Sequence, residues 1–255
     1  MIGNHLPMKD NSFIVGLADS LFHWVNYIVD VKRRAILNEG SIKYAISEYL
    51  EVSKQKPSQR TTIASVHVKE YVFEFTHPIY KGKSLDLNVT FHGKYNETPI
   101  FVEFKFLHND KFYDSTMDTY IDDIFRLYSV SSSKKGHSFF LLLAECDQIR
   151  SVGITSAQRG DTLQRKDGVD QSGHKVDFSK LLSIDTKDSA RETLIQDLLP
   201  SEKGDHIARF KNTYNLREGC EDAILPQNKI ITKLVYPTPD MLDSCNMGVY
   251  VWEIM

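Results

Sequence analysis

The 255-residue sequence lacks the signatures of several well-marked protein classes. Its three cysteines, Cys146, Cys220 and Cys245, are odd in number and form no C-x-x-C pair, which disfavours a disulfide framework and a cysteine zinc site. The nine histidines never stand at H-x-x-x-H spacing, and neither a P-loop nor a G-x-G-x-x-G is present. We therefore expect no zinc site, and the motifs that bind nucleotide phosphates in P-loop and dinucleotide-binding proteins are absent.

Long apolar runs and a basic surplus are also missing. No stretch approaches the roughly 18 apolar residues of a membrane span. Residues Met1–Ser12 lack a basic start followed by an apolar run, so we expect no signal peptide and a cytoplasmic protein. The net charge is −3, but an enzyme that cuts and releases DNA needs only a local basic track. The run Val52–Lys69, with four Lys or Arg and no acidic residue, is a candidate track, and a solvated loop is the alternative.

The N-terminal part of the chain has the apolar periodicity of helices. Hydrophobic residues make up 41% of the sequence, as in an ordinary globular protein. Helical spacing predicts one helix over Phe13–Leu37, closed by Gly40, and a second over Ser41–Val52.

From residue 61 the pattern changes to that of strands. Alternating and β-branched residues predict strands at Val66–Thr76, Ser84–Phe91 and Ile100–Leu107, of which the last two form a hairpin. A helix over Ser115–Ser129 follows, and then a continuous apolar strand, Phe139–Ala144, typical of a sheet covered on both faces.

The remainder is less regular. Residues 147–183 are polar and aperiodic, which predicts a long loop or insertion. Helices are predicted over Ala190–Leu199 and Asp205–Tyr214, and strands over Lys229–Tyr236 and Gly248–Ile254. The fold class predicted is α/β, a central mixed sheet flanked by helices in one domain over residues 1–255, with a core over about 40–144 and C-terminal strands over about 229–254.

The predicted hairpin brings charged side chains together. Its turn centres near residues 94 and 95, so paired positions have numbers that sum to about 189. Asp86 then lies opposite Glu103, with Cβ atoms about 5 Å apart. Because side chains alternate, Asp86, Asn88, Glu103 and Lys105 share one face, and Leu87, Val89, Val102, Phe104 and Phe106 share the other.

Two facing carboxylates in an apolar strand are costly unless something compensates their charge. A divalent cation between Asp86 and Glu103 would turn their repulsion into binding, and Mg²⁺ suits carboxylate ligands. Lys105 would then lie near an attacking water, where its ammonium stabilises negative charge. An ion-paired hairpin face without function is the alternative to this interpretation.

An Asp at the start of one strand and Glu-x-Lys in the next resembles the PD-(D/E)xK nuclease superfamily, whose fold is restriction-endonuclease-like. The likeness covers about residues 40–144, with Leu85 in place of the proline of the family. It implies Mg²⁺- or Mn²⁺-dependent hydrolysis of phosphodiester bonds, with Asp86 and Glu103 as metal ligands and Lys105 at the attacking water. The resemblance also implies the Phe104 carbonyl as a ligand, and a helix glutamate, for which Glu48 is the first candidate and Glu39 the second.

The resemblance implies an endonuclease that acts on nucleic acid, on DNA in preference to RNA, in restriction or another defence against foreign DNA. A homodimer is an open alternative to a monomer, because cutting both strands takes two active sites. A set of polar and basic residues in the insertion is a candidate for reading DNA, and a disordered surface loop is the alternative: Gln158, Arg159, Arg165, Lys166, His174 and Lys175. A non-catalytic binding or assembly subunit of the same fold, and an unrelated α+β protein with a coincidental hairpin, are the rival interpretations.

Overall fold

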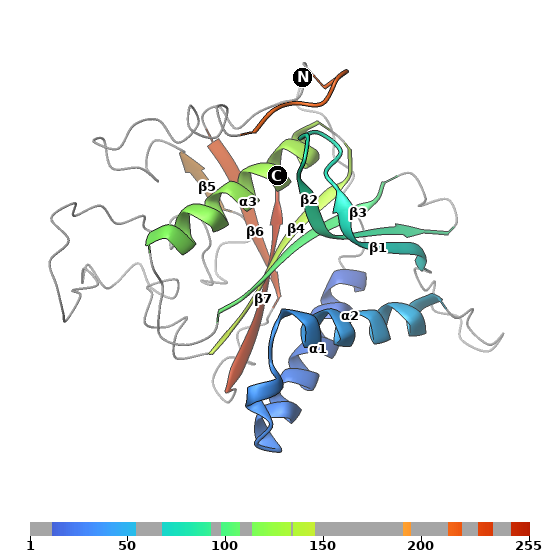
Figure 1. The fold of residues 1–255 in the computed structure, drawn as a ribbon, viewed down its shortest axis with the longest axis vertical. Coiled ribbons are helices and arrows are strands. Elements are labelled where there is room, and N and C mark those ends of the chain that lie inside the picture. The colour runs from blue at the N-terminus through green and yellow to red at the C-terminus, as the bar shows by residue number, and fades with distance from the viewer. Residues whose placement is uncertain are drawn as a thin grey trace, which may run out of the picture.

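The protein is an α/β protein with a central mixed sheet flanked by helices (Figure 1). The structure is a computed structural model and describes residues 12–54, 68–92, 98–107, 114–133, 135–145, 191–194, 214–220, 229–236 and 246–255. The helices are α1 (Ser12–Asp30), α2 (Glu39–Lys54) and α3 (Asp114–Ser132), with a 3₁₀ turn at Arg34–Ile36. The strands are β1 (Val68–Thr76), β2 (Ser84–Phe91), β3 (Ile100–Phe106), β4 (His137–Glu145), β5 (Arg191–Leu194), β6 (Lys229–Tyr236) and β7 (Met247–Ile254).

Within the described residues, the sheet has seven strands in the order β1-β2-β3-β4-β7-β6-β5. Among these strands only β3 and β4 pair in parallel, because α3 carries the chain back between them, and the other neighbours are antiparallel. The predicted order of a helix, three strands, a crossover helix and an apolar strand between residues 40 and 144 is confirmed. β2 spans the predicted residues, and β6 and β7 match the predicted C-terminal strands to within one residue.

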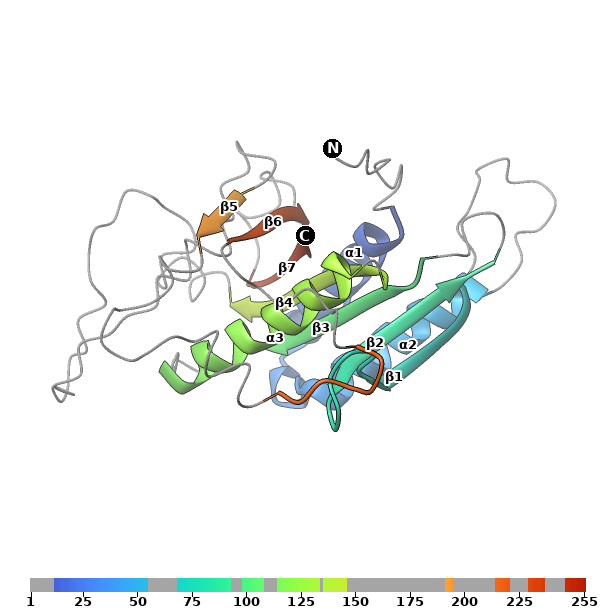
Figure 2. The same ribbon diagram turned by 90° about the horizontal axis from the view of Figure 1, so that it is seen from above.

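Helices cover both faces of the sheet, as the apolar sequence of β4 predicts (Figure 2). One core cluster joins α1 and α2 to Leu87, Val89, Val102 and Phe104. The other joins α3 to Phe101 and to alternate residues of β4 and β7. Alternation correctly predicted which residues of β2 and β3 face α1 and α2. They are Leu87, Val89, Val102 and Phe104, and Phe106 packs against the same cluster.

The end of the first helix was predicted wrongly. α1 ends at Asp30, and Lys32 has a positive φ of 58°, a backbone conformation that cannot continue a right-handed helix. Gly40 lies inside the first turn of α2 and closes nothing. α2 starts earlier than predicted because the Asn38 Oδ1 accepts a hydrogen bond from the Ser41 amide at 3.0 Å, which caps the helix.

A second prediction is wrong at residues 191–194, where the structure has strand β5 in place of a helix over Ala190–Leu199. The segment pairs with β6, so backbone hydrogen bonding to a sheet edge outweighs the helical composition. The predicted insertion at 147–183 and most of the predicted helix at 205–214 lie outside the described residues, as does most of the basic run at 52–69. In the described ranges, no helix combines the length and apolar character of a membrane span.

Candidate active site

The β2–β3 hairpin has the predicted register. Leu87 pairs with Val102, Asn88 with Phe101 and Val89 with Ile100, and each pair of numbers sums to 189. The backbone ladder between the strands stops at Leu87, although β2 begins at residue 84 and β3 continues to residue 106. Beyond that point β2 stays paired with β1, and β3 with β4. The two strands therefore separate at the position where Asp86 and Glu103 lie.

Asp86 fills this fork between the strands. Its Oδ2 accepts a hydrogen bond from the Phe104 amide at 2.9 Å, in place of a backbone carbonyl. Leu85 packs in the α3 core cluster, and Leu87 packs in the cluster on the opposite face of the sheet. Residues two apart in a regular strand share a face, so β2 departs from regular alternation at Asp86. The carboxyls of Asp86 and Glu103 lie close enough for each to affect the pKa of the other.

Glu103 and Lys105 meet α3 on the other side of the fork. Glu103 is 2% exposed, and its Oε1 lies 3.0 Å from the Arg126 Nη2. The Lys105 Nζ lies 2.7 Å from the Asp123 Oδ2. Arg126 also donates to Asp123, and its Nη1 donates to the Ser84 carbonyl at 2.9 Å. Two acidic and two basic side chains thus form one buried network between β3 and α3.

Burial determines the charge state of this network. It raises the pKa of Asp86, and it raises the pKa of Glu103 well above its ordinary value, with the Asp123 carboxylate adding to the effect. Burial opposes the charge on Lys105, but the carboxylates of Asp123 and Glu103 outweigh it and raise the pKa of that amine. The site therefore holds a firmly charged ammonium beside a pair of carboxyl groups that retain a proton more readily than in water.

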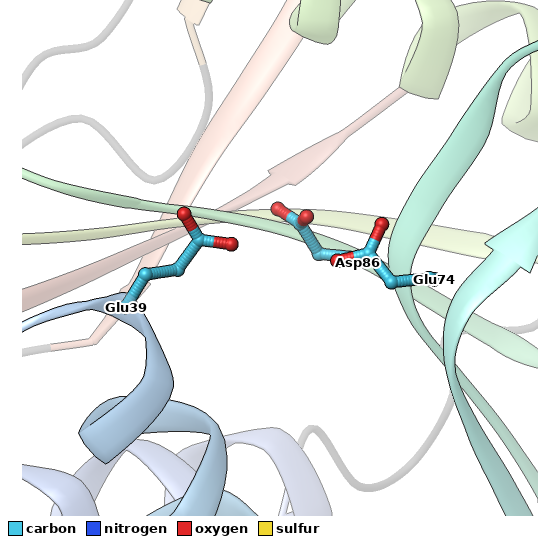
Figure 3. Close-up of side chains that lie close together, drawn as sticks. All are labelled: Glu39, Glu74 and Asp86. Atoms are coloured by element: carbon cyan, nitrogen blue, oxygen red, sulfur yellow. The ribbon is translucent and has the colours of Figure 1, made fainter.

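A second group of carboxylates reaches Asp86 from α2 and β1 (Figure 3). One oxygen each of Glu39, Glu74 and Asp86 lie within 4.8 Å of one another. The Lys43 Nζ lies 2.9 Å from the Glu39 Oε1 and also pairs with the Glu74 Oε1. Burial opposes the charge on Lys43, but these hydrogen bonds raise its pKa. In the structure, the Lys43 ammonium thus compensates the charge of the two exposed glutamates.

The structure brings together Asp86, Glu103 and Lys105, and it places the second-choice helix glutamate, Glu39, near Asp86. Glu48, the first choice, is exposed and lies nine residues further along α2, about 13 Å along the helix axis. It does not belong to the carboxylate group around Asp86. Phe104 is present through its amide, and the role of its carbonyl stays a prediction.

Sequence reasoning missed Glu74, Lys43, Asp123 and Arg126. Glu74 faces Asp86 across the β1–β2 pair, between the pairs Phe73–Leu87 and Phe75–Leu85, so the register of that hairpin is the signal that identifies it. In the sequence, Asp118, Asp122 and Asp123 are typical of the solvent-exposed face of a helix, which predicts an exposed Asp123 and an Arg126 paired with Asp122. Both expectations are wrong, since Asp123 is 2% exposed and binds Arg126 itself.

The signal for Asp123 was in its spacing. It stands three residues after Tyr120 and four before Leu127, both buried, so it lies in the apolar stripe of α3. Lys43 carries a comparable signal, since it stands four residues after Glu39 on the same helix.

Comparison of the chain with family models, with curated proteins and with solved structures finds no match. What the site does must therefore be argued from its own geometry.

Proposed function

We propose that this protein is a divalent-metal-dependent nuclease that hydrolyses the phosphodiester bonds of DNA. The observation that carries the proposal is the fork between β2 and β3, where the Asp86 and Glu103 carboxyls meet beside the charged Lys105 amine. A site that acts on a phosphodiester needs acidic ligands for a cation and a positive charge for the phosphate. The fork supplies both within a buried network.

The donor atoms fit Mg²⁺ or Mn²⁺. All are carboxylate oxygens, the ligands that hard cations prefer, and one oxygen each of Glu39, Glu74 and Asp86 lie within 4.8 Å of one another. Asp86 and Glu103 would hold the ion, with Glu39 or Glu74 from the neighbouring elements. The bound ion supplies positive charge to the phosphate oxygens and lowers the pKa of water.

The chain's own residues supply the rest. The Lys105 ammonium stabilises negative charge on the attacking oxygen and on the phosphate as the new bond forms. The carboxyls of Asp86 and Glu103 orient the reactants at the fork. Because desolvation strengthens each of these interactions, the burial of Glu103 makes the same charges more effective than they would be on an open surface.

The strand pattern of Asp86 and of Glu103-x-Lys105 supports membership of the PD-(D/E)xK superfamily, as the sequence suggests. Restriction or another defence against foreign DNA, in the cytoplasm, is the setting that we propose with it.

A non-catalytic subunit that binds nucleic acid is the second candidate function. It is favoured by the ion pairs within the site, which compensate the negative charge of the carboxylates. Arg126 pairs with Glu103, and Lys43 pairs with Glu39 and Glu74. A site of this kind is stable without a metal ion, as a binding subunit requires.

The test is cleavage of labelled single- and double-stranded DNA, and of RNA, by the purified protein with Mg²⁺ or Mn²⁺. We expect DNA to be cut and a chelator to stop the reaction. Lys105→Ala should lower the turnover number by about 10²-fold or more, because a charge-stabilising donor is lost, and leave the affinity for Ca²⁺, measured by calorimetry, within about threefold. Lys135→Ala, which removes an exposed lysine just after α3 and outside the basic run, is the matched control and should cut normally.

Two results would redirect the proposal. Binding of nucleic acid without cleavage under any of these conditions would support the binding subunit. Cleavage that persists in Lys105→Ala at the wild-type rate would place the chemistry elsewhere in the protein.

A further inference from the structure

α3 turns two charged side chains toward the sheet. Asp123 is 2% exposed, and the side chain of Arg126 is 11% exposed. Buried charges cost free energy unless they are compensated, and a buried ion pair contributes little net stability compared with apolar residues of the same size. The stability of the fold alone therefore gives no reason for these residues in the apolar stripe of the helix.

The contacts of both residues lead to the candidate active site. Asp123 holds Lys105 with one carboxylate oxygen, at 2.7 Å, and Arg126 with the other. Arg126 in turn reaches Glu103 Oε1 at 3.0 Å and the carbonyl of Ser84 at 2.9 Å. The helix thus fixes the two charged residues of β3 and the start of β2 through one connected set of interactions.

We propose that Asp123, itself held by Arg126, is a positioning residue that fixes the Lys105 ammonium beside the Asp86–Glu103 carboxyl pair. The proposal rests on the proposed nuclease function, for which Lys105 is the charge-stabilising group. A lysine amine sits on a flexible four-carbon stem and carries three N–H donors. The ion pair with Asp123 holds the amine from the protein side and leaves its other side for water and phosphate.

Exposure gives the direction of this arrangement. The Asp123 side chain is 3% exposed and that of Lys105 is 24% exposed, so the anchor lies on the protein side of the amine and the open side faces solvent. A displacement of about 1 Å in a catalytic group can lower a rate by about 10²-fold, so the anchor matters even though it touches no reactant.

The kinetic test compares Asp123→Asn with Asp122→Asn. Asp122 is the adjacent residue on α3, and its carboxylate accepts a hydrogen bond from Tyr214 at 3.0 Å, so the control removes the same charge next to the site. We expect Asp123→Asn to lower the turnover number by about 10- to 100-fold with KM within about threefold, because substrate binding is left intact. Asp123→Glu should restore part of the rate, and Asp122→Asn should cut normally.

A second readout is independent of activity. A lysine-directed acylating reagent, followed by mass spectrometry, measures how firmly Lys105 is held, with the exposed Lys69 as internal reference. We expect Lys105 to react faster in Asp123→Asn than in the wild type and in Asp122→Asn. A purely structural role for Asp123 would lower the melting temperature without this selective change.

The outcomes separate this proposal from the proposed function. Suppose that the wild type cuts DNA and that Asp123→Asn folds. If this variant then cuts at the wild-type rate, or if the labelling of Lys105 is unchanged, the positioning role alone is overturned. A wild type that cuts no nucleic acid overturns both. Where Asp123→Asn does not fold, Asp123→Glu decides the question, since a folded variant with wild-type turnover and labelling also overturns it.

Discussion

At the scale of single residues, the site keeps carboxyl groups where charge is disfavoured. Burial raises the pKa of Glu103 above its ordinary value of 4.5, so the folded protein binds that proton more tightly than the unfolded chain does. The contribution of the protonated carboxyl to stability is therefore complete below pH 4.5 and is lost as the pH rises through the pKa of the folded protein. Ionisation of Glu103 then destabilises the metal-free fold.

Glu103→Gln should show this directly, because glutamine has the shape of the protonated acid and cannot ionise. With a chelator present, we expect the variant to have a larger free energy of unfolding than the wild type at pH about 8. This difference in free energy should shrink by up to about 1.4 kcal/mol per pH unit on acidification. Urea unfolding at several pH values measures it, with the exposed Glu48→Gln as control. The opposite result is a stability of Glu103→Gln, relative to the wild type, that decreases between pH about 4.5 and pH about 8. That result would mean that Arg126 keeps Glu103 ionised.

At the scale of elements, local patterns predicted most of the strands, because residues that alternate between a core and a polar face leave a period of two in the sequence. The register of the β2–β3 hairpin also followed, since it depends only on the position of the turn. What local patterns did not reveal depends on partners distant in the sequence. β5 is a strand because β6 offers it an edge, and Asp123 is buried because Lys105 and Arg126 compensate it.

The start of α2 is the element on which Glu39 depends. Asn38 caps the helix through two hydrogen bonds with Ser41, one in each direction, and Glu39 is the next residue. Asn38→Ala should lower the free energy of unfolding by about 1 kcal/mol, since the Ser41 amide loses its acceptor. It should also weaken the binding of Ca²⁺, because the first turn that carries Glu39 frays.

Urea unfolding and calorimetry measure the two effects. The control is Ser47→Ala, which removes an exposed hydroxyl bonded to the Tyr44 carbonyl within the same helix. It should change neither quantity by more than about 0.5 kcal/mol. Unchanged Ca²⁺ affinity in a destabilised Asn38→Ala would show that Glu39 is not a ligand.

At the scale of the whole molecule, the site joins elements that are far apart in the sequence. Glu39 comes from α2, Glu74 from β1, Asp86 from β2 and Glu103 from β3, while α3 supplies Arg126 and holds Lys105 through Asp123. Lys43 and Arg126 compensate these carboxylates in the structure, and a divalent ion would have to compete with both cations. Ion binding would then tie one side of the sheet together.

Binding to the folded state alone stabilises a protein by mass action, by about 2.7 kcal/mol at a ligand concentration 100 times Kd. We therefore expect Ca²⁺ or Mg²⁺ to raise the melting temperature of the wild type, and a chelator to reverse the change. Glu39→Gln should reduce the shift, because it removes an oxygen from the carboxylate group around Asp86. Glu48→Gln, on the same helix but outside that group, should leave the shift unchanged.

Glu39→Gln has two opposite effects on the binding of a divalent ion. It removes a ligand, which lowers the affinity for the ion, and it breaks the ion pair between Glu39 and Lys43, which reduces the competition from the Lys43 ammonium at that position. Lys43→Met removes that competitor altogether and should increase the ion-induced shift in melting temperature, if Lys43 and the ion share these carboxylates. A smaller shift in Lys43→Met than in the wild type would instead show that the lysine holds Glu39 and Glu74 in the geometry that the ion requires. An absent shift in every variant, the wild type included, would leave Lys43 as the permanent counter-ion of the group and favour the binding subunit over the nuclease.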